Sequence, residues 1–209
     1  MTGIISDNVG RTSGLIKAAS GGGGVWTLIK TLTASGDGDL SFVDGTDDVV
    51  LDSTYPIYLF KFINIHPASA STLGFNLSID SGSNYNVAKT TSDFITNRAE
   101  SDSGNDSVYY ETALDLAQGT GVQKIANSIG NLNDDCAGGE LWLFGLSSTT
   151  FVKHFICTSV TSSEHVATYN MYIAGYGNTT SAVDAVQFSM SSGNIDAGKI
   201  KLYGLKDSA

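Results

Sequence analysis

The chain has 209 residues, of which 41% are hydrophobic and only 15% charged, and its formal net charge is −10. The 11 Lys and Arg residues form no cluster, which speaks against a nucleic-acid partner because phosphate backbones are bound by grouped cations. No stretch approaches the roughly 18 apolar residues of a membrane span, and the first residues lack the basic and apolar regions of a signal peptide. We therefore expect a protein made in the cytoplasm, with an apolar core and neither a nucleic-acid nor a membrane partner.

The first 24 residues differ from the rest in composition. They contain a few isolated apolar residues and end in four consecutive glycines, which have almost no backbone preference and act as a hinge. We predict an N-terminal arm over residues 1–24 that docks on a partner, and a β-sandwich domain over residues 25–209. An arm that folds back as an edge strand is the alternative. The candidate docking residues are Ile4, Ile5, Val9, Leu15 and Ile16.

Short apolar runs bounded by Gly, Asn, Asp and Ser follow at close intervals, which is typical of strands in an all-β protein. The expected strands are 25–33, 40–43, 57–65, 73–80, 123–128, 140–146, 150–161, 166–176, 185–191 and 199–205. Residues 73–80 alternate between apolar and polar, as a half-buried strand does. Residues 57–65 are apolar on both faces, with Ile65 on the side opposite Tyr58, Phe60 and Phe62. This pattern predicts an antiparallel β-sandwich, and a jelly roll in particular.

Residues 81–121 are rich in Ser, Asn and Gly. We expect them to form a long irregular connection, with a short helix near residues 111–117. Connections of this length are often functional loops.

Two kinds of binding site are candidates. Exposed tyrosines could stack on sugars, and the candidates are Tyr109, Tyr110, Tyr172 and Tyr176, although tyrosine is also an ordinary strand residue. Two acidic groups could bind calcium, which takes six to eight oxygen ligands, although turns also favour these residues. The first group is Asp37, Asp39, Asp44, Asp47 and Asp48, and the second is Asn131, Asn133, Asp134 and Asp135.

Catalytic signals are sparse. The three histidines are His66, His154 and His165, and no Gly-x-Ser-x-Gly motif accompanies them. We predict that the protein is not an enzyme and that no cofactor is bound, with calcium as the one alternative. Cys136 and Cys157 show no metal-binding spacing, and their pairing stays open.

The two ends of the chain carry a resemblance. Residues 3–17, GIISDNVGRTSGLIK, and residues 186–205, VQFSMSSGNIDAGKIKLYGL, resemble small virion proteins of marine tailed bacteriophages. The resemblance implies a jelly-roll virion component, and it carries over no functional residue.

Three classes of function follow. The first is a structural protein exposed on the virion, either a tail fibre or tail appendage module used in host attachment or a head decoration protein. The second is a carbohydrate-binding module, and the third is a hydrolase with two paired carboxylates. Because several strands are apolar on both faces, we also predict a homo-oligomer, a trimer. The virion hypothesis adds other virion proteins and host-surface glycans as further expected partners.

Overall fold

The computed structural model describes residues 26–101 and 106–207, and in these ranges the only regular elements are strands, all paired antiparallel. The fold is thus all-β, as the sequence predicts. The strands are β1 (Trp26–Thr33), β2 (Asp39–Val43), β3 (Ile57–Pro67), β4 (Ser71–Ser78), β5 (Lys89–Ala99), β6 (Ser107–Tyr110), β7 (Gln123–Ile129), β8 (Ala137–Phe144), β9 (Lys153–Ser163), β10 (Ala167–Gly177), β11 (Ala185–Met190) and β12 (Ile195–Leu205).

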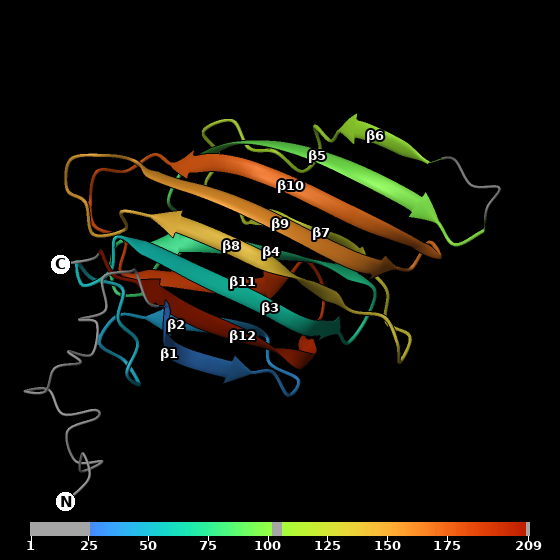
Figure 1. The fold of residues 1–209 in the computed structure, drawn as a ribbon, viewed down its shortest axis with the longest axis horizontal. Coiled ribbons are helices and arrows are strands. Elements are labelled where there is room, and N and C mark those ends of the chain that lie inside the picture. Colours follow the sequence, from blue (N-terminus) through green and yellow to red (C-terminus); the bar gives the residue numbers. More distant parts are fainter. Residues whose placement is uncertain (1–25, 102–105, 208–209) are drawn as a thin grey trace, which may run out of the picture.

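The strands form two layers of unequal size. The large sheet has the order β1-β12-β3-β8-β9-β10-β5-β6, and Figure 1 shows it running from β1 at the bottom to β6 at the top. The small sheet has the order β7-β4-β11-β2. A single residue pair, Ile129 with Ser163, links β7 to β9 and so joins the two sheets at one end.

The small sheet and the β1, β12, β3 and β8 part of the large sheet enclose a core of aromatic rings, which we call the central core. Phe188 on β11 lies at its centre, and its ring contacts those of Phe60 and Phe62 on β3, at centroid distances of 5.2 and 5.4 Å. Phe42 and Phe75 pack around the same ring. Edge-to-face packing of this kind adds to the roughly 1.5–3 kcal/mol that burial of each large apolar side chain contributes.

The other half of the large sheet, formed by β9, β10, β5 and β6, extends beyond the small sheet. The segment 111–122 runs beside one end of β5, where Lys89 and Gly119 exchange two backbone hydrogen bonds and the Thr91 amide donates to the Leu116 carbonyl. Gln123 donates from Nε2 to the Leu114 carbonyl and accepts from Thr91 Oγ1. We call this half the extension and the buried groups beneath it the polar core.

Two expectations for residues 81–121 are wrong. The segment contains β5 and β6, and its residues 111–117 form turns, not a helix. β5 escaped detection because Lys89, Thr91 and Asp93, which are fully or almost fully buried, are polar. The alternation that reveals a half-buried strand is therefore absent from its sequence.

Ile65 also lies on the other side from the one expected. The register of β3 against β8 shifts between Phe62 and Ile65, and Asn64 has a positive φ of 51°. This irregularity turns the side chain of Ile65 into the core, where it is fully buried. Ile65 therefore faces the same core as Phe62.

The predicted arm at residues 1–24, with Ile4, Ile5, Val9, Leu15 and Ile16, lies outside the described residues. Both cysteines carry free thiols. Cys157 is buried, and Cys136 is partly exposed.

Candidate binding face on the large sheet

The outward side of the large sheet, which we call the outer face, exposes an unusual number of large apolar side chains. Register places Trp142, which is partly exposed, beside the exposed Ile156 on β9 and beside Leu59, which is buried, on β3. Near β1, Trp26 and Leu28 are 38% and 50% exposed. A monomeric protein seldom exposes a contiguous patch of this kind unless the patch binds something.

Over the extension the outer face is apolar as well. The exposed residues there, which we call the extension patch, are Phe94, Tyr110, Ile156, Val160 and Tyr172. Phe94 pairs with Tyr110 on one side and with Tyr172 on the other, while Tyr172 pairs with Thr158, which lies between Ile156 and Val160 on β9. Directly opposed and diagonal side chains on one sheet face contact each other. The five side chains therefore form one continuous surface.

The tyrosines predicted to bind glycans are only partly brought together. Tyr110, Tyr172 and Tyr176 lie on the outer face, but Tyr109 pairs with the buried Ile95 and so projects to the other side. Tyr172 stacks on Phe94 with a centroid distance of 5.1 Å and an angle of 11°. Each of these two rings therefore has one face covered by the other. Phe94 was not a predicted site residue because it sits in the polar β5 sequence.

A second aromatic group lies on the outer face where β1, β12, β3 and β8 run side by side (Figure 1). It lines a shallow hollow of about 290 Å³, which we call the tryptophan hollow. The lining residues are Trp26, Leu59, Lys61, Glu140, Trp142 and Tyr203.

The geometry of the tryptophan hollow is held by specific contacts. The two indole rings meet edge to face, with centroids 5.4 Å apart and an angle of 75°. Trp142 Nε1 donates to Glu140 Oε1 at 3.0 Å, and Lys61 Nζ lies 3.7 Å from Glu140 Oε2. The hollow thus combines an aromatic floor with one anionic and one cationic group. None of the predicted glycan residues belongs to it.

The first predicted calcium group is engaged in turns. The Asp37 carboxylate accepts from the Ser35 amide, and that of Asp44 accepts from the Leu51 amide, each at 2.8 Å. Asp39 accepts from the Ser41 hydroxyl. Asp47 and Asp48 adopt positive φ angles of 50° and 66° in the turn after β2.

In the second group the carboxylate of Asp135 is buried and shared between two partners, the Leu132 amide and the Ser162 hydroxyl. Asn131, Asn133 and Asp134 lie in the exposed turn before it. Across residues 26–101 and 106–207, no three His, Cys, Asp or Glu side chains converge in the way a metal site requires.

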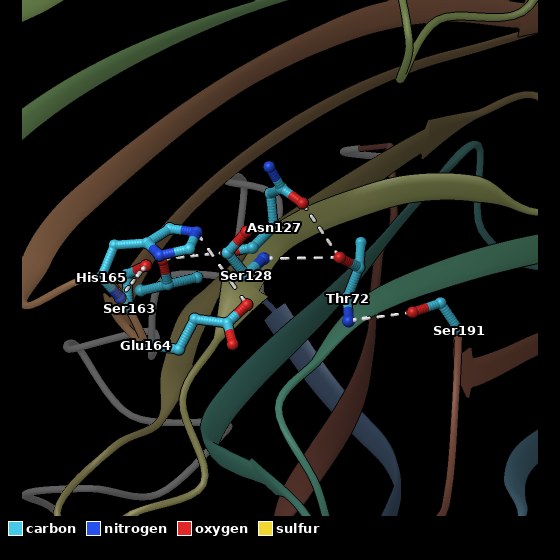
Figure 2. Close-up of polar contacts among 8 residues, drawn as sticks. Thr72, Asn127, Ser128, Ser163, Glu164, His165 and Ser191 are labelled. Carbon is cyan, nitrogen blue, oxygen red and sulfur yellow. Dashed lines mark hydrogen bonds and ion pairs between the residues drawn. The ribbon is translucent and has the colours of Figure 1, made fainter.

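The histidines fall in separate places. Figure 2 shows His165 in the β9–β10 turn, where its backbone amide donates to Ser163 Oγ at 3.2 Å and its Nε2 lies 4.0 Å from Glu164 Oε1. The Ser163 hydroxyl therefore contacts the backbone of His165 and is not joined to the imidazole. His66 Nδ1 donates to the Asp135 carbonyl at 2.8 Å and ties β3 to the turn before β8.

A buried carboxylate in the polar core was not anticipated. Asp93 is fully buried, and among the described residues neither of its carboxylate oxygens has a hydrogen-bond partner. Burial raises the pKa of Asp93 to about 7, and the carboxylates of Glu111 and Asp115 add to the shift. The burial of this carboxylate could not be recognised from the sequence, because a polar strand shows no alternation of apolar and polar residues.

Comparisons with family models, curated proteins and solved structures gave no match to this chain. In the part of the chain that the structure describes, no helix could cross a membrane.

Proposed function

We propose that this protein is a virion structural module built on a jelly roll, exposed on the particle as a tail appendage, and assembled as a homotrimer through the extension patch. It performs no catalysis in this proposal. The virion role is supported by the sequence resemblance of residues 3–17 and 186–205. A head decoration protein would use the same fold and the same patch.

The strand order supports the jelly roll. When β5, β6, β9 and β10 are set aside, eight strands remain. The first, eighth, third and sixth of these lie in one sheet, and the second, seventh, fourth and fifth lie in the other. This is the order that two interlocked Greek keys produce. In the proposal the extension is therefore an addition to a jelly roll, made from two inserted segments that pair with each other.

The observation that carries the assembly is the extension patch. Ile156 and Val160 are 49% and 46% exposed on a flat strand surface, although hydrophobic side chains are stabilised by removal from water. Around a threefold axis the patches of three copies can face one another and remove these side chains from water. The patch lies on the extension, so in this proposal the interface gives the extension a role in assembly.

Sedimentation velocity of the full chain tests the assembly. We expect a trimer at micromolar concentration, and Val160→Asp should weaken it by about a hundredfold or more, because the new charge would be buried without a partner. Leu132→Asp is the matched control, since Leu132 is exposed but lies outside the patch. A wild-type chain that sediments only as a monomer contradicts the proposal. Antibody labelling of purified particles tests the virion role separately.

A carbohydrate-binding module is the second candidate. The stacked pair of Tyr172 and Phe94 offers little free ring face for a sugar. The tyrosine set therefore supports subunit packing better than it supports glycan binding.

A further inference from the structure

We propose that the tryptophan hollow is a binding site for a neutral saccharide, with a pyranose ring seated on the indoles of Trp26 and Trp142. The site adjoins the extension patch, because Trp142 pairs with Ile156, but the two share no residue. It lies on β1, β12, β3 and β8, whereas the patch lies on β9, β10, β5 and β6.

The floor of the hollow suits the apolar side of a sugar. One face of a pyranose carries C–H bonds, which pack on the electron-rich face of an aromatic ring, and indole has the largest such face among the side chains. Because the two indoles meet edge to face, at an angle of 75°, they form two walls of a corner. Tyr203 and the buried Leu59 complete the apolar surface.

The rim suits the hydroxyl groups of a sugar. A hydroxyl both donates and accepts, and the hollow offers an acceptor and a donor side by side in Glu140 and Lys61, 3.7 Å apart. Their side chains are 34% and 48% exposed, so both can reach a ligand. The bond from Trp142 Nε1 holds the Glu140 carboxylate in place, which reduces the conformational entropy lost on binding.

Local charge distinguishes this ligand from others. One carboxylate and one ammonium group cancel within the hollow, so a neutral ligand is preferred over an anion or a cation. A nonpolar segment of a protein would leave the charged pair without hydrogen bonds, which is costly once water is excluded. A ligand with closely spaced hydroxyls replaces the water that solvates the pair.

The sequence supplies a clean reporter, because the chain has 2 tryptophans and both line the hollow. Titration of the full chain with a panel of neutral methyl pyranosides and their short oligomers, followed by tryptophan emission, measures binding at this site alone. We expect a saturable change for at least one sugar series. No saturable change across the panel at millimolar sugar overturns the proposal.

Variants then locate the binding by calorimetry. Trp142→Ala should raise the Kd by about tenfold, because one aromatic contact contributes at most about that factor to affinity. Glu140→Gln, which keeps the size and an acceptor, should weaken binding less than Glu140→Ala does. Tyr172→Ala in the extension patch is the matched control and should bind normally. Binding that survives Trp142→Ala and is lost in Tyr172→Ala contradicts this site, and so does any Trp142→Ala effect that merely follows a lowered melting temperature.

Two further measurements address other occupants. A synthetic peptide of residues 1–24 that shifts the emission when no sugar does would show that the arm is the ligand. An emission maximum that moves with protein concentration would show a second copy there. Either result overturns the saccharide assignment. The proposed trimer is tested separately by sedimentation and does not depend on this outcome.

Discussion

The central core and the polar core lie beneath the same large sheet and share one apolar cluster, but beneath the extension buried polar side chains such as Lys89, Asp93 and Gln123 lie beside apolar ones such as Ile95 and Ile173. In the central core a second sheet covers the strands, and the rings of Phe60 and Phe188 meet with no polar group between them. At the polar core β7 packs beneath β9 and β10, and the irregular segment 111–122 lies beside β5. A sheet satisfies its own backbone through strand pairing, but a loop does not, so its amides and carbonyls need partners from below.

Side chains of β5 and β7 supply those partners. Thr91 Oγ1 accepts from the Leu116 amide at 2.8 Å, and Gln123 Nε2 donates to the Leu114 carbonyl at 3.0 Å. Lys89 Nζ donates to Asn76 Oδ1 and to the Val87 carbonyl, and burial lowers the pKa of Lys89 to about 8. The comparison teaches that an irregular segment packed against a sheet brings polar side chains into the buried space beside it.

The largest expected effect comes from breaking the central core. Phe188→Ala removes a fully buried ring that contacts four other phenylalanines, and we expect it to lower the free energy of unfolding by about 3–5 kcal/mol. Urea denaturation measures this. Phe151→Ala is the control, because Phe151 is 72% exposed and its loss should change stability by no more than about 0.5 kcal/mol. Equal losses in the free energy of unfolding for the two variants would show that the central core is not the main source of stability.

A pH-dependent effect distinguishes the polar core. Asp93 has a pKa of about 7 in the folded protein and 3.8 as a free side chain, so between these values the folded state binds the extra proton. The contribution of Asp93 to stability is therefore complete below about pH 4 and declines until about pH 7. Asp93→Asn should remove this decline, a difference of about 2–4 kcal/mol at neutral pH that follows from roughly 1.4 kcal/mol per pKa unit. Melting temperatures from pH 3 to 8 measure it.

Asp80→Asn provides the opposite control for the pH series. Hydrogen bonds from Asn84 and Ser78 lower the pKa of Asp80, so its stabilising effect is present above about pH 4 and is lost as the pH falls. The two variants should therefore change the curve in opposite directions. Parallel curves for wild type and Asp93→Asn would contradict the assignment of a protonated carboxyl group to the polar core.

The smallest expected effect is a gain in stability within the extension. Val166 closes the β9–β10 hairpin with a φ of 55°, which a β-branched residue adopts at a cost, and its side chain is 63% exposed. Val166→Asn should raise the free energy of unfolding by about 1 kcal/mol, because asparagine tolerates this conformation. Val166→Thr keeps the branch and should give no gain. Thermal unfolding of the wild type and of the two variants measures the difference.

The contrast between the cores also explains what could be predicted from the sequence. The strand at 73–80 was found because apolar and polar residues alternate there, and it is β4, shifted by two residues. β5 was missed because its inward positions include Lys89 and Asp93. Aromatic candidates were found by residue type, but residue type does not give the face, so Tyr109 was included and Phe94 was not. The tryptophan hollow joins residues from β1, β3, β8 and β12, which only the register brings together.

The route of the chain through the extension has a consequence for folding kinetics. β9 and β10 are consecutive and joined by a short turn, so their pairing requires closure of only a small loop. β5 pairs with β10 from far away in the chain, with Lys89 opposite Gly177 and Ala99 opposite Ala167. Because loop-closure entropy grows with separation, contacts of this kind form late. During refolding, the amides of the β9–β10 hairpin should therefore gain protection from solvent exchange before those of β5. Until β5 pairs with β10, the outer edge of β10 is free to pair with another chain.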